Sequence, residues 1–224
     1  MNEGLQADMV ISVDKVSKRY GYRIIKRVFD LICSIIGLVL LIPIIIIVKL
    51  LYIITGDFKS IFLVQKRIGK NGKEFRLFKF RTMIPNADEE LKILLKENKE
   101  LAKEYKVNKK LKNDPRITKV GKILRKASLD ELPQMLNVLV GSMSIIGNRP
   151  YLPREKKDMK KYYESIITTK PGLTGYWQVS GRSNTTFEKR LELESYYSKN
   201  CSLKMDVKIF FKTFKVVLFG KGAN

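Results

Sequence analysis

Two adjacent carboxylates, Asp130 and Glu131, lie in the segment Ser128-Leu129-Asp130-Glu131-Leu132-Pro133-Gln134 of a strongly basic chain. The eight residues at 119–126 before this segment contain four basic side chains and no acid. A carboxylate nucleophile must be ionised, and neighbouring cations together with a helix N-terminus favour the ionised form. The alternative is structural, because Ser128 and Glu131 also fit a Ser-x-x-Glu capping box at a helix start. This segment taken alone favours the capping box.

Composition restricts the available chemistry. Lys and Arg number 44 against 22 Asp and Glu, with no His, so the formal net charge is +22. The absence of His excludes Ser-His-Asp and Cys-His mechanisms and His-based metal sites. Cys33 and Cys201 are too few and too far apart for a zinc ribbon or a disulfide framework, and they indicate thiols in a reducing compartment. The excess of positive charge predicts a polyanionic partner: nucleic acid, an anionic membrane surface or a phosphorylated substrate.

The stretch 31–48 contains eighteen residues without a charge. As a helix it would be roughly 27 Å long, enough to cross the hydrocarbon core of a bilayer. Pro43 lies inside this stretch and predicts a bend. Both flanks are basic, and because positive charge marks the cytoplasmic side, this favours a helix that enters and leaves by the same face. The residues alone leave the re-entrant and spanning geometries open.

Alternating residues at 61–82, interrupted by Gly69-Lys70-Asn71-Gly72, predict a β-hairpin with Lys79 and Arg81 on a cationic face. Residues 86–112 are typical of a charged surface helix, and the spacing at 129–139 predicts another helix. Residues 205–219 predict a basic amphipathic helix on the membrane surface, with packing on a core as the alternative. The expected fold class is α/β (α+β-like), a small helix-rich domain with a short β-hairpin.

Two later segments are candidate anion-binding loops. Gly147-Asn148-Arg149-Pro150 places an Arg beside a Pro, and residues 171–182 combine three glycines with Trp177 and Arg182. Glycines that let the backbone approach a ligand, with an aromatic ring and an Arg, would suit a nucleotide. The alternative is a tight turn that leads into an edge strand.

Taken together, these motifs resemble one family. The residues that carry the resemblance occur in order: Lys26-Arg27-Val28-Phe29-Asp30, Lys79-Phe80-Arg81-Thr82-Met83, Asn113-Asp114-Pro115-Arg116-Ile117-Thr118, Ser128 to Gln134, Gly141 to Gly147, Arg149-Pro150 and Pro171 to Arg182. From about Arg23 to Gly222 the chain resembles the bacterial sugar transferases, which are monotopic polyprenyl-phosphate phosphoglycosyl transferases.

The resemblance implies transfer of a sugar-1-phosphate from a UDP-sugar to undecaprenyl phosphate, with release of UMP. Asp130 would be the nucleophile that carries the phosphosugar, and Glu131 would help to hold Mg²⁺. This step would start the synthesis of capsule, exopolysaccharide, O-antigen or another glycan. Charge at the donor phosphates requires cations. The expected phosphate-binding or nucleotide-binding residues are Lys79, Arg81, Arg125, Arg149, Pro150, Gly175, Gln178 and Arg182.

The resemblance also predicts the organisation of the chain. Residues 1–22 would form a tail, 23–56 a re-entrant membrane helix broken at Pro43, and 57–222 a catalytic domain on the cytoplasmic face of the bacterial inner membrane. Lys26, Arg27 and Asp30 would belong to the membrane attachment. The chain is expected to be a minimal form without additional N-terminal transmembrane helices, and its basic, amphipathic surface permits a homodimer.

Two departures from the family pattern are visible. Asn148 stands where the family usually has Pro, which is expected to loosen the loop, and Glu194 stands where Asp is usual, so no role is assigned to it. A membrane-tethered nucleic-acid-binding protein is the alternative function from another class, although an acidic dyad inside a basic surface would repel phosphate backbones. A glycosyl transferase that releases UDP is a narrower alternative, but the chain contains no Asp-x-Asp motif.

Overall fold

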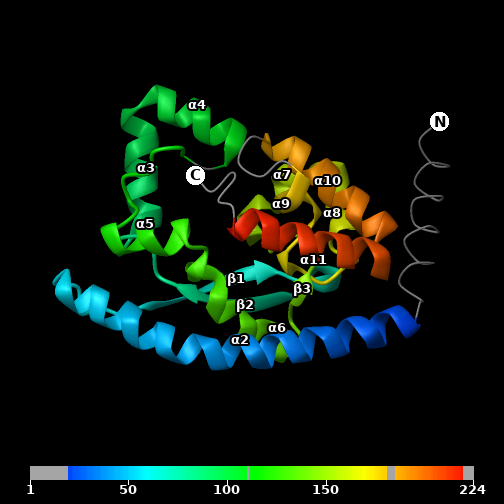
Figure 1. The fold of residues 1–224 in the computed structure, drawn as a ribbon. Coiled ribbons are helices and arrows are strands. Elements are labelled where there is room, and N and C mark those ends of the chain that lie inside the picture. Colours follow the sequence, from blue (N-terminus) through cyan, green and yellow to red (C-terminus); the bar gives the residue numbers. More distant parts are fainter. Residues whose placement is uncertain (1–19, 110, 181–184, 219–224) are drawn as a thin grey trace.

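A computed structural model describes residues 20–109, 111–180 and 185–218, which form a helix-rich domain with two small sheets (Figure 1). The strands are β1 (Phe62–Ile68), β2 (Glu74–Phe80), β3 (Ser144–Ile146) and β4 (Gly172–Thr174). The α-helices are α2 (Tyr20–Ile54), α3 (Ala87–Glu97), α4 (Lys99–Asn108), α5 (Lys119–Lys126), α6 (Met135–Leu139), α7 (Lys156–Met159), α8 (Tyr163–Ile166), α9 (Tyr176–Ser180), α10 (Phe187–Asn200) and α11 (Leu203–Leu218). Short 3₁₀ helices are η1 (Lys70–Gly72), η2 (Leu129–Gln134), η3 (Pro153–Glu155) and η4 (Lys160–Tyr162). The predicted helix-rich class with a short hairpin is confirmed.

Helix α2 runs along one side of the domain and is bowed around it (Figure 1). Its buried residues lie on one face, since they are spaced by three, four or seven positions: Asp30, Ser34, Gly37, Leu41, Val48 and Tyr52. The opposite face exposes many Ile, Leu and Val side chains. Helix α2 continues through Pro43. The predicted break at this residue is therefore wrong if it means an interruption of the helix. Packing along both halves of the helix holds it together across the missing hydrogen bond.

The predicted hairpin is confirmed. Strands β1 and β2 pair antiparallel, with Leu63 opposite Lys79 and Arg67 opposite Phe75. In the turn between them, Asn71 and Gly72 have φ of 56° and 75°, the left-handed region that Asn and Gly tolerate best. Phe80 is fully buried and packs with Leu41 and Val48 of α2, so the hairpin sits on the membrane-helix candidate.

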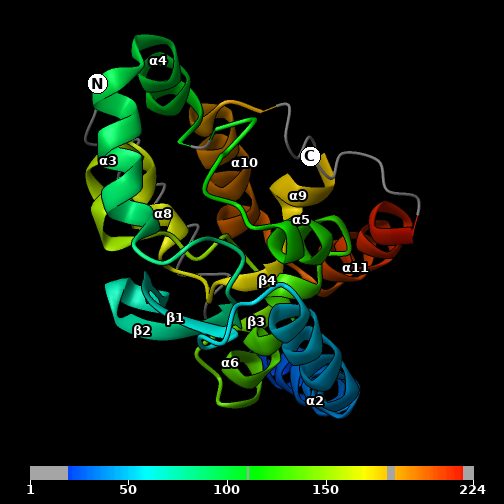
Figure 2. The same cartoon turned by 90° about the vertical axis from the view of Figure 1, so that its left-hand side faces the viewer.

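A second pair of strands, β3 and β4, is parallel, with Ser144 opposite Gly172 and Ile146 opposite Thr174. Ile145 and Ile146 join the largest buried cluster, which also contains Val138, Met143 and Ile209. Ile209 belongs to α11, so the predicted C-terminal helix exists and packs on this core through one face. Figure 2 shows α11 beside α9 and above α2.

The charged stretch 86–112 forms two helices, α3 and α4, rather than the single helix predicted. Asn98 is the reason, because its side chain accepts hydrogen bonds from Glu100 N and Leu101 N and so caps the start of α4. In Figure 2 these two helices stand apart from α2 at the other end of the domain.

Candidate active site

The dyad lies on η2, a 3₁₀ helix. With three residues per turn, Leu129 and Leu132 share one face, and both pack on the cluster that includes α2 residues. Asp130 and Glu131 therefore lie on the other faces. The predicted capping box is wrong: Ser128 has φ 55° and its side chain makes no capping hydrogen bond. The helix predicted over 129–139 is η2 followed by α6.

Four cations from four parts of the chain surround the dyad. Asp130 interacts electrostatically with Lys79 of β2 and Arg125 of α5. Glu131 interacts with Arg149, Lys79 and Arg67. The structure thus brings Lys79, Arg125 and Arg149 to the dyad, which the sequence analysis placed together only by resemblance.

The protonation of the dyad differs from the expectation. Desolvation raises the pKa of Asp130 above the usual carboxyl range, and Lys79 and Arg125 oppose this only in part. For Glu131, loss of hydration and then the charge of Asp130 raise the pKa to about 7. Glu131 is exposed as a residue, yet loss of hydration at its carboxylate is the main cause of its raised pKa. The expectation that Asp130 keeps a low pKa is therefore wrong, because burial removes hydration that the nearby cations replace only in part.

Arg67 is a member of the cluster that the sequence analysis missed. Its guanidinium donates to the Pro150 carbonyl (2.9 Å) and the Gln65 side chain (2.6 Å). Burial and then the nearby Arg149 charge lower the pKa of Arg67 to about 10. The hairpin register could have indicated that Arg67 belongs to the cluster, because Arg67 and Lys79 lie on the same face when Leu63 pairs with Lys79.

Lys79 is the lysine of this cluster, and its pKa is lowered by its surroundings. Burial and then the positive charge of Arg67 lower its pKa to about 8, although Asp130 and Glu131 act in the opposite direction. The ammonium group of a lysine with this pKa becomes more favourable when negative charge develops beside it. It is suited to stabilise an anion during a reaction.

Arg125 is positioned by two close contacts between α5 and the end of β2. Its Nε donates to Thr82 Oγ1 at 3.0 Å. A Cβ on Gly121 would lie 2.0 Å from the Thr82 carbonyl oxygen, so only Gly allows α5 to approach this closely. The helix starts at Thr118, whose side chain accepts from Gly121 N.

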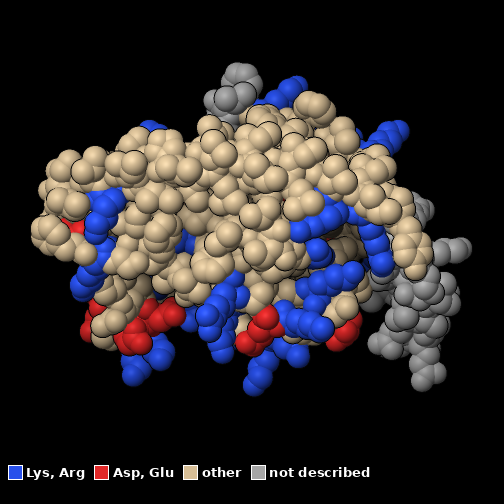
Figure 3. All heavy atoms as spheres, turned by 90° about the horizontal axis from the view of Figure 1, so that it is seen from below, with Lys and Arg blue, Asp and Glu red and all other residues tan. Residues whose placement is uncertain are grey.

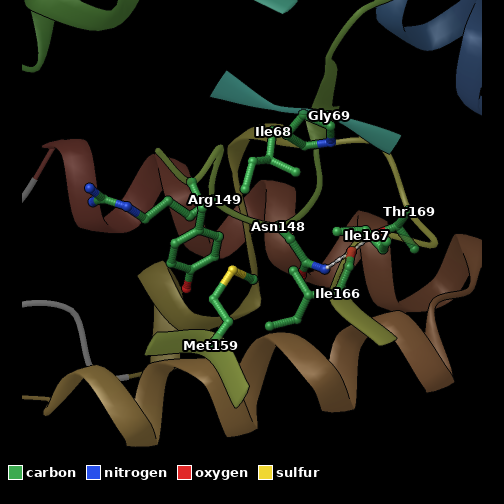
Figure 4. Close-up of a pocket in the computed structure, with 10 residues that line it drawn as sticks. Ile68, Gly69, Asn148, Arg149, Met159, Ile166, Ile167 and Thr169 are labelled. Atoms are coloured by element: carbon green, nitrogen blue, oxygen red, sulfur yellow. Dashed lines mark hydrogen bonds between the residues drawn. The ribbon is translucent and has the colours of Figure 1, made fainter. Parts of the chain in front are cut away.

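Arg149 lies on a loop that hydrogen bonds to other parts of the domain fix in place. Its backbone N–H donates to Glu194 Oε1 of α10 at 2.9 Å, and the Pro150 carbonyl accepts from Arg67. Asn148 Nδ2 donates to Ile166 O, Thr169 Oγ1 and Ser198 Oγ at 3.1, 3.1 and 2.6 Å. Figure 4 shows the Asn148 amide turned toward Thr169 while the Arg149 side chain runs the other way. The expected loosening of the loop by Asn148 is wrong, because a buried amide fastens it at three points.

Arg81 lies outside the cluster. Its guanidinium binds both carboxylate oxygens of Asp57 (2.9 and 3.0 Å) and the Ser60 carbonyl (2.7 Å), and it stacks on Tyr52 at 4.6 Å. The Tyr52 hydroxyl also donates to the Arg81 carbonyl. Arg81 thus fastens the end of α2 to β2, and the structure does not bring it to the dyad as predicted.

The residues predicted for membrane attachment point toward the domain. Lys26 binds Asp206 of α11 at 2.6 Å. Arg27 donates to the carbonyls of Val138 and Leu139, both at 2.7 Å, at the end of α6. Asp30 accepts from Ser144 Oγ (3.0 Å) and Ile145 N (2.8 Å). These contacts fix α2 to the domain.

Within the glycine-rich block, Gly175 has a structural role. A Cβ on Gly175 would lie 2.1 Å from the Gly147 carbonyl, so this Gly makes room for the chain itself. Gln178 Nε2 donates to Leu173 O at 3.3 Å, and its Oε1 is buried without a partner. Arg182 lies outside the described residues.

Several buried polar atoms among the described residues have no hydrogen-bond partner, including Arg149 Nε, Trp177 Nε1 and Gln178 Oε1. Buried polar atoms are normally paired, so such a group is a common mark of a site that binds a ligand or water. Arg190 stacks on the Trp177 ring at 4.4 Å and keeps it in place. The arrangement offers donors and an acceptor beside a cationic cluster.

Among the described residues no group of three or more His, Cys, Asp or Glu could hold a metal ion. The pair Asp130 and Glu131 nevertheless fits Mg²⁺, which is commonly bound by one or two carboxylates and completed by phosphate oxygens. Loss of hydration and then the charge of Asp130 raise the pKa of Glu131, and a divalent cation bound to both carboxylates would favour their ionised forms.

Comparison with known proteins agrees with the geometry. A sequence model described as "Bacterial sugar transferase" matches residues 21–220. The chain belongs to the bacterial sugar transferase family. Among members of this family, it is 42% identical over 218 residues to the undecaprenyl-phosphate galactose phosphotransferase of Salmonella typhimurium, covering 96% of this chain and 45% of that protein. It is 42% identical over 198 residues to the exopolysaccharide production protein ExoY of Sinorhizobium fredii, covering 88% and 87% of the two chains.

A third member, the galactosyl transferase CpsE of Streptococcus agalactiae, is 41% identical over 216 residues, covering 96% of this chain and 47% of the relative. The chain thus spans a little under half the length of the Salmonella and Streptococcus relatives. The matched part of this chain contains the dyad, the cationic cluster and α2.

Proposed function

We propose that this chain transfers a sugar-1-phosphate from a UDP-sugar to undecaprenyl phosphate, releases UMP and so starts the assembly of an exopolysaccharide, a capsule or a related glycan. The acceptor is suggested by the names of relatives such as the Salmonella galactose phosphotransferase. The observation that carries the proposal is the dyad on η2 inside a cluster of Lys79, Arg125, Arg149 and Arg67, on a domain bound to an apolar helix.

The reaction takes place in two displacements. A carboxylate oxygen of Asp130 forms a bond to the β-phosphorus, the bond from this phosphorus to the bridging oxygen breaks, and UMP leaves. A phosphate oxygen of undecaprenyl phosphate then attacks the phosphorus on Asp130, which regenerates the carboxylate and forms undecaprenyl-diphospho-sugar. Splitting one transfer into two in this way is the usual advantage of a covalent intermediate.

The surrounding residues have separate roles in this scheme. Lys79 and Arg125 favour the ionised form of Asp130 against desolvation. Arg149, Lys79 and Arg67 neutralise charge on the diphosphate, which is where transition-state charge spreads in phosphoryl transfer. Glu131 and the diphosphate oxygens would hold Mg²⁺, which supplies further neutralisation of phosphate charge when bound.

Helix α2 provides the membrane attachment in the proposal. Among the described residues it is the one helix long and apolar enough to cross a membrane. One face is fixed to the domain and the other is apolar and exposed, so the dyad is kept near the bilayer that contains the acceptor. Because the donor is soluble and the acceptor is a lipid, the site belongs at this interface, which we place on the cytoplasmic face of the inner membrane.

The test uses the full chain in detergent or vesicles with undecaprenyl phosphate and a panel of UDP-sugars, and it measures UMP. We expect Asp130→Asn to lower UMP release by roughly 10⁴-fold or more, since the nucleophile is removed. Intact-mass measurement should detect a phosphosugar on the wild-type chain and none on this variant.

Asp158→Asn is the matched control, because Asp158 forms a surface pair with Lys109. It should keep wild-type activity. Full UMP release by Asp130→Asn would contradict the mechanism, and release of UDP in place of UMP would indicate an ordinary glycosyl transferase.

A further inference from the structure

A second basic site lies away from the dyad, at the N-terminal end of α2. A cavity of about 240 Å³ is lined there by α2, η1, β3, the segment before β4 and the end of α10. Five of its lining residues are cations, Arg23, Lys26, Arg27, Lys70 and Lys170, against one acid, Asp30. We call this the α2 basic cavity. None of its lining residues belongs to the dyad cluster.

Two of the cations are committed to the fold. Lys26 binds Asp206, and Arg27 donates to two carbonyls of α6. The one acid is committed as well, since Asp30 accepts from Ser144 and Ile145. The carboxylates near the cavity are therefore already used in fixing α2.

Lys70 and Lys170 are two of the three other cations that line the cavity. Neither lies within 4.0 Å of a carboxylate oxygen in the part of the chain that the structure describes. Lys170 Nζ and Arg27 Nη2 both lie 3.5 Å from the position that a Cβ of Gly141 would occupy, so two cations are neighbours there. Burial and then one neighbouring Arg lower the pKa of each lysine, Arg23 for Lys70 and Arg27 for Lys170, while Asp30 opposes the shift of Lys170.

The position of the cavity indicates what fills it. Arg23 and Arg27 alternate along α2 with Ile24 and Val28, whose side chains are 64% and 50% exposed on the apolar outer face. Figure 3 shows blue Lys and Arg side chains gathered along the margin of the broad uncharged surface. A phosphate in the cavity could therefore be attached to an apolar chain lying along α2. The volume is below the 300–1,000 Å³ usual for larger organic ligands, which suits a headgroup better than a nucleotide sugar.

We infer that the α2 basic cavity binds the phosphate group of an anionic membrane lipid, with Lys70 and Lys170 as its main contacts. The inference uses the proposed membrane attachment of α2 but none of the transfer chemistry. A soluble phosphate shares the same chemistry, and the test separates the two sources.

The experiment is native mass spectrometry of the full chain in detergent, titrated with phosphatidylglycerol, with phosphatidylcholine or with inorganic phosphate. The wild type should retain one phosphatidylglycerol in preference to phosphatidylcholine. Since each Lys near a membrane surface contributes about fivefold, K70Q/K170Q should weaken this binding by roughly tenfold to thirtyfold. K70R/K170R should restore it.

K92Q/K96Q is the matched control, because it removes the same charge from exposed positions on α3. It should bind phosphatidylglycerol as the wild type does. Thermal unfolding of each variant checks that it is folded, and UMP release is measured separately, so failure of this inference is distinct from failure of the proposed function.

Three outcomes would overturn the inference: equal retention of the two lipids by wild type, equal loss in both Gln double variants, or no loss in K70Q/K170Q. Binding of inorganic phosphate as tight as that of phosphatidylglycerol would overturn the assignment to a lipid.

Discussion

Lys79 connects the two carboxylates of the dyad, because it interacts with both Asp130 and Glu131. Burial brings its pKa to about 8, so at neutral pH it is mostly charged. Lys79 is half-buried, so its interaction with the phosphate of the proposed reaction would be less screened, and worth more, than that of a surface lysine. The charge of this side chain, rather than its packing, should be what the reaction needs.

Lys79→Met keeps the length of the side chain and removes the charge. We expect UMP release to fall by roughly 10²–10³-fold, the range found when one preorganised electrostatic contact is removed. Lys66→Met is the control, since the Lys66 side chain is 77% exposed on the opposite face of the hairpin. Equal activity of the two variants would show that Lys79 does not contact the diphosphate.

Glu194 makes the stability of the fold depend on pH. It is 1% exposed, and desolvation raises its pKa from 4.5 to about 7, although the Arg149 N–H and nearby Arg charges oppose the shift. Because the folded state holds the proton more tightly than the unfolded state, its contribution is complete below pH 4.5. It is lost as pH rises through about 7, and the loss amounts to about 3 kcal/mol.

Glu194→Gln replaces the protonated acid by a neutral amide of the same shape. The free energy of unfolding of the wild type, compared with that of this variant, should therefore decrease between pH 5 and pH 8. The measurement is chemical unfolding at both pH values. Glu192→Gln, at an exposed position on the same helix, should follow the wild type. Parallel pH profiles of the wild type and Glu194→Gln would contradict the assignment.

At the scale of elements, η2 packs on α2 through one face, and β2 and α5 lie against its other faces. Leu129 and Leu132 pack on the α2 cluster, while β2 and α5 supply Lys79 and Arg125. The distance between α5 and β2 depends on Gly121, whose Cβ position is only 2.0 Å from the Thr82 carbonyl. A change at Gly121 should displace Arg125 without touching the dyad.

Gly121→Ala should be destabilising, although Ala is favoured over Gly in a helix by about 1 kcal/mol. We expect a loss of roughly 1–3 kcal/mol from the backbone clash, with lower UMP release as Arg125 moves. Gly21→Ala is the control, because nothing lies within 4 Å of its Cβ position in α2. It should be neutral or slightly stabilising in thermal unfolding, and stabilisation by both substitutions would disprove the tight contact.

At the scale of the whole molecule, the two faces of α2 have different roles. One face carries the buried stripe from Asp30 to Tyr52, and the other exposes Ile36 and Ile47, each 56% accessible. Because the first face is part of the core that supports η2, helix α2 and the dyad form one unit. In the proposed function, membrane attachment through α2 would therefore set where the dyad stands relative to the lipid acceptor.

Charge on the exposed face should release the protein from membranes. For I36D/I47D we expect a large decrease in the fraction that floats with vesicles, since an acid within the apolar region costs about 3 kcal/mol. I93D/V107D is the control, because these residues are 49% and 55% exposed on α3 and α4. Flotation of I36D/I47D at the wild-type level would exclude this face as the attachment.

The hairpin, the apolar helix and the position of the acidic dyad could be predicted from the amino-acid sequence. The hairpin follows from alternation around Gly69 to Gly72, and the apolar helix follows from eighteen uncharged residues. Asp130, Glu131 and the family were reached from motifs in order, because family motifs are linear. Each of these features depends on neighbours in the chain.

Which cations face the dyad, and how readily the dyad ionises, depend on the tertiary packing. Arg67 belongs to the cluster while Arg81 binds Asp57, although both are arginines of the same hairpin. The register and the position of Asp57 make this difference, and neither can be seen in a motif. Desolvation by elements distant in sequence likewise raised the pKa of Asp130, where local charges predicted an acid that ionises readily. Burial depends on the packing of the whole chain, which is why the sequence alone could not supply it.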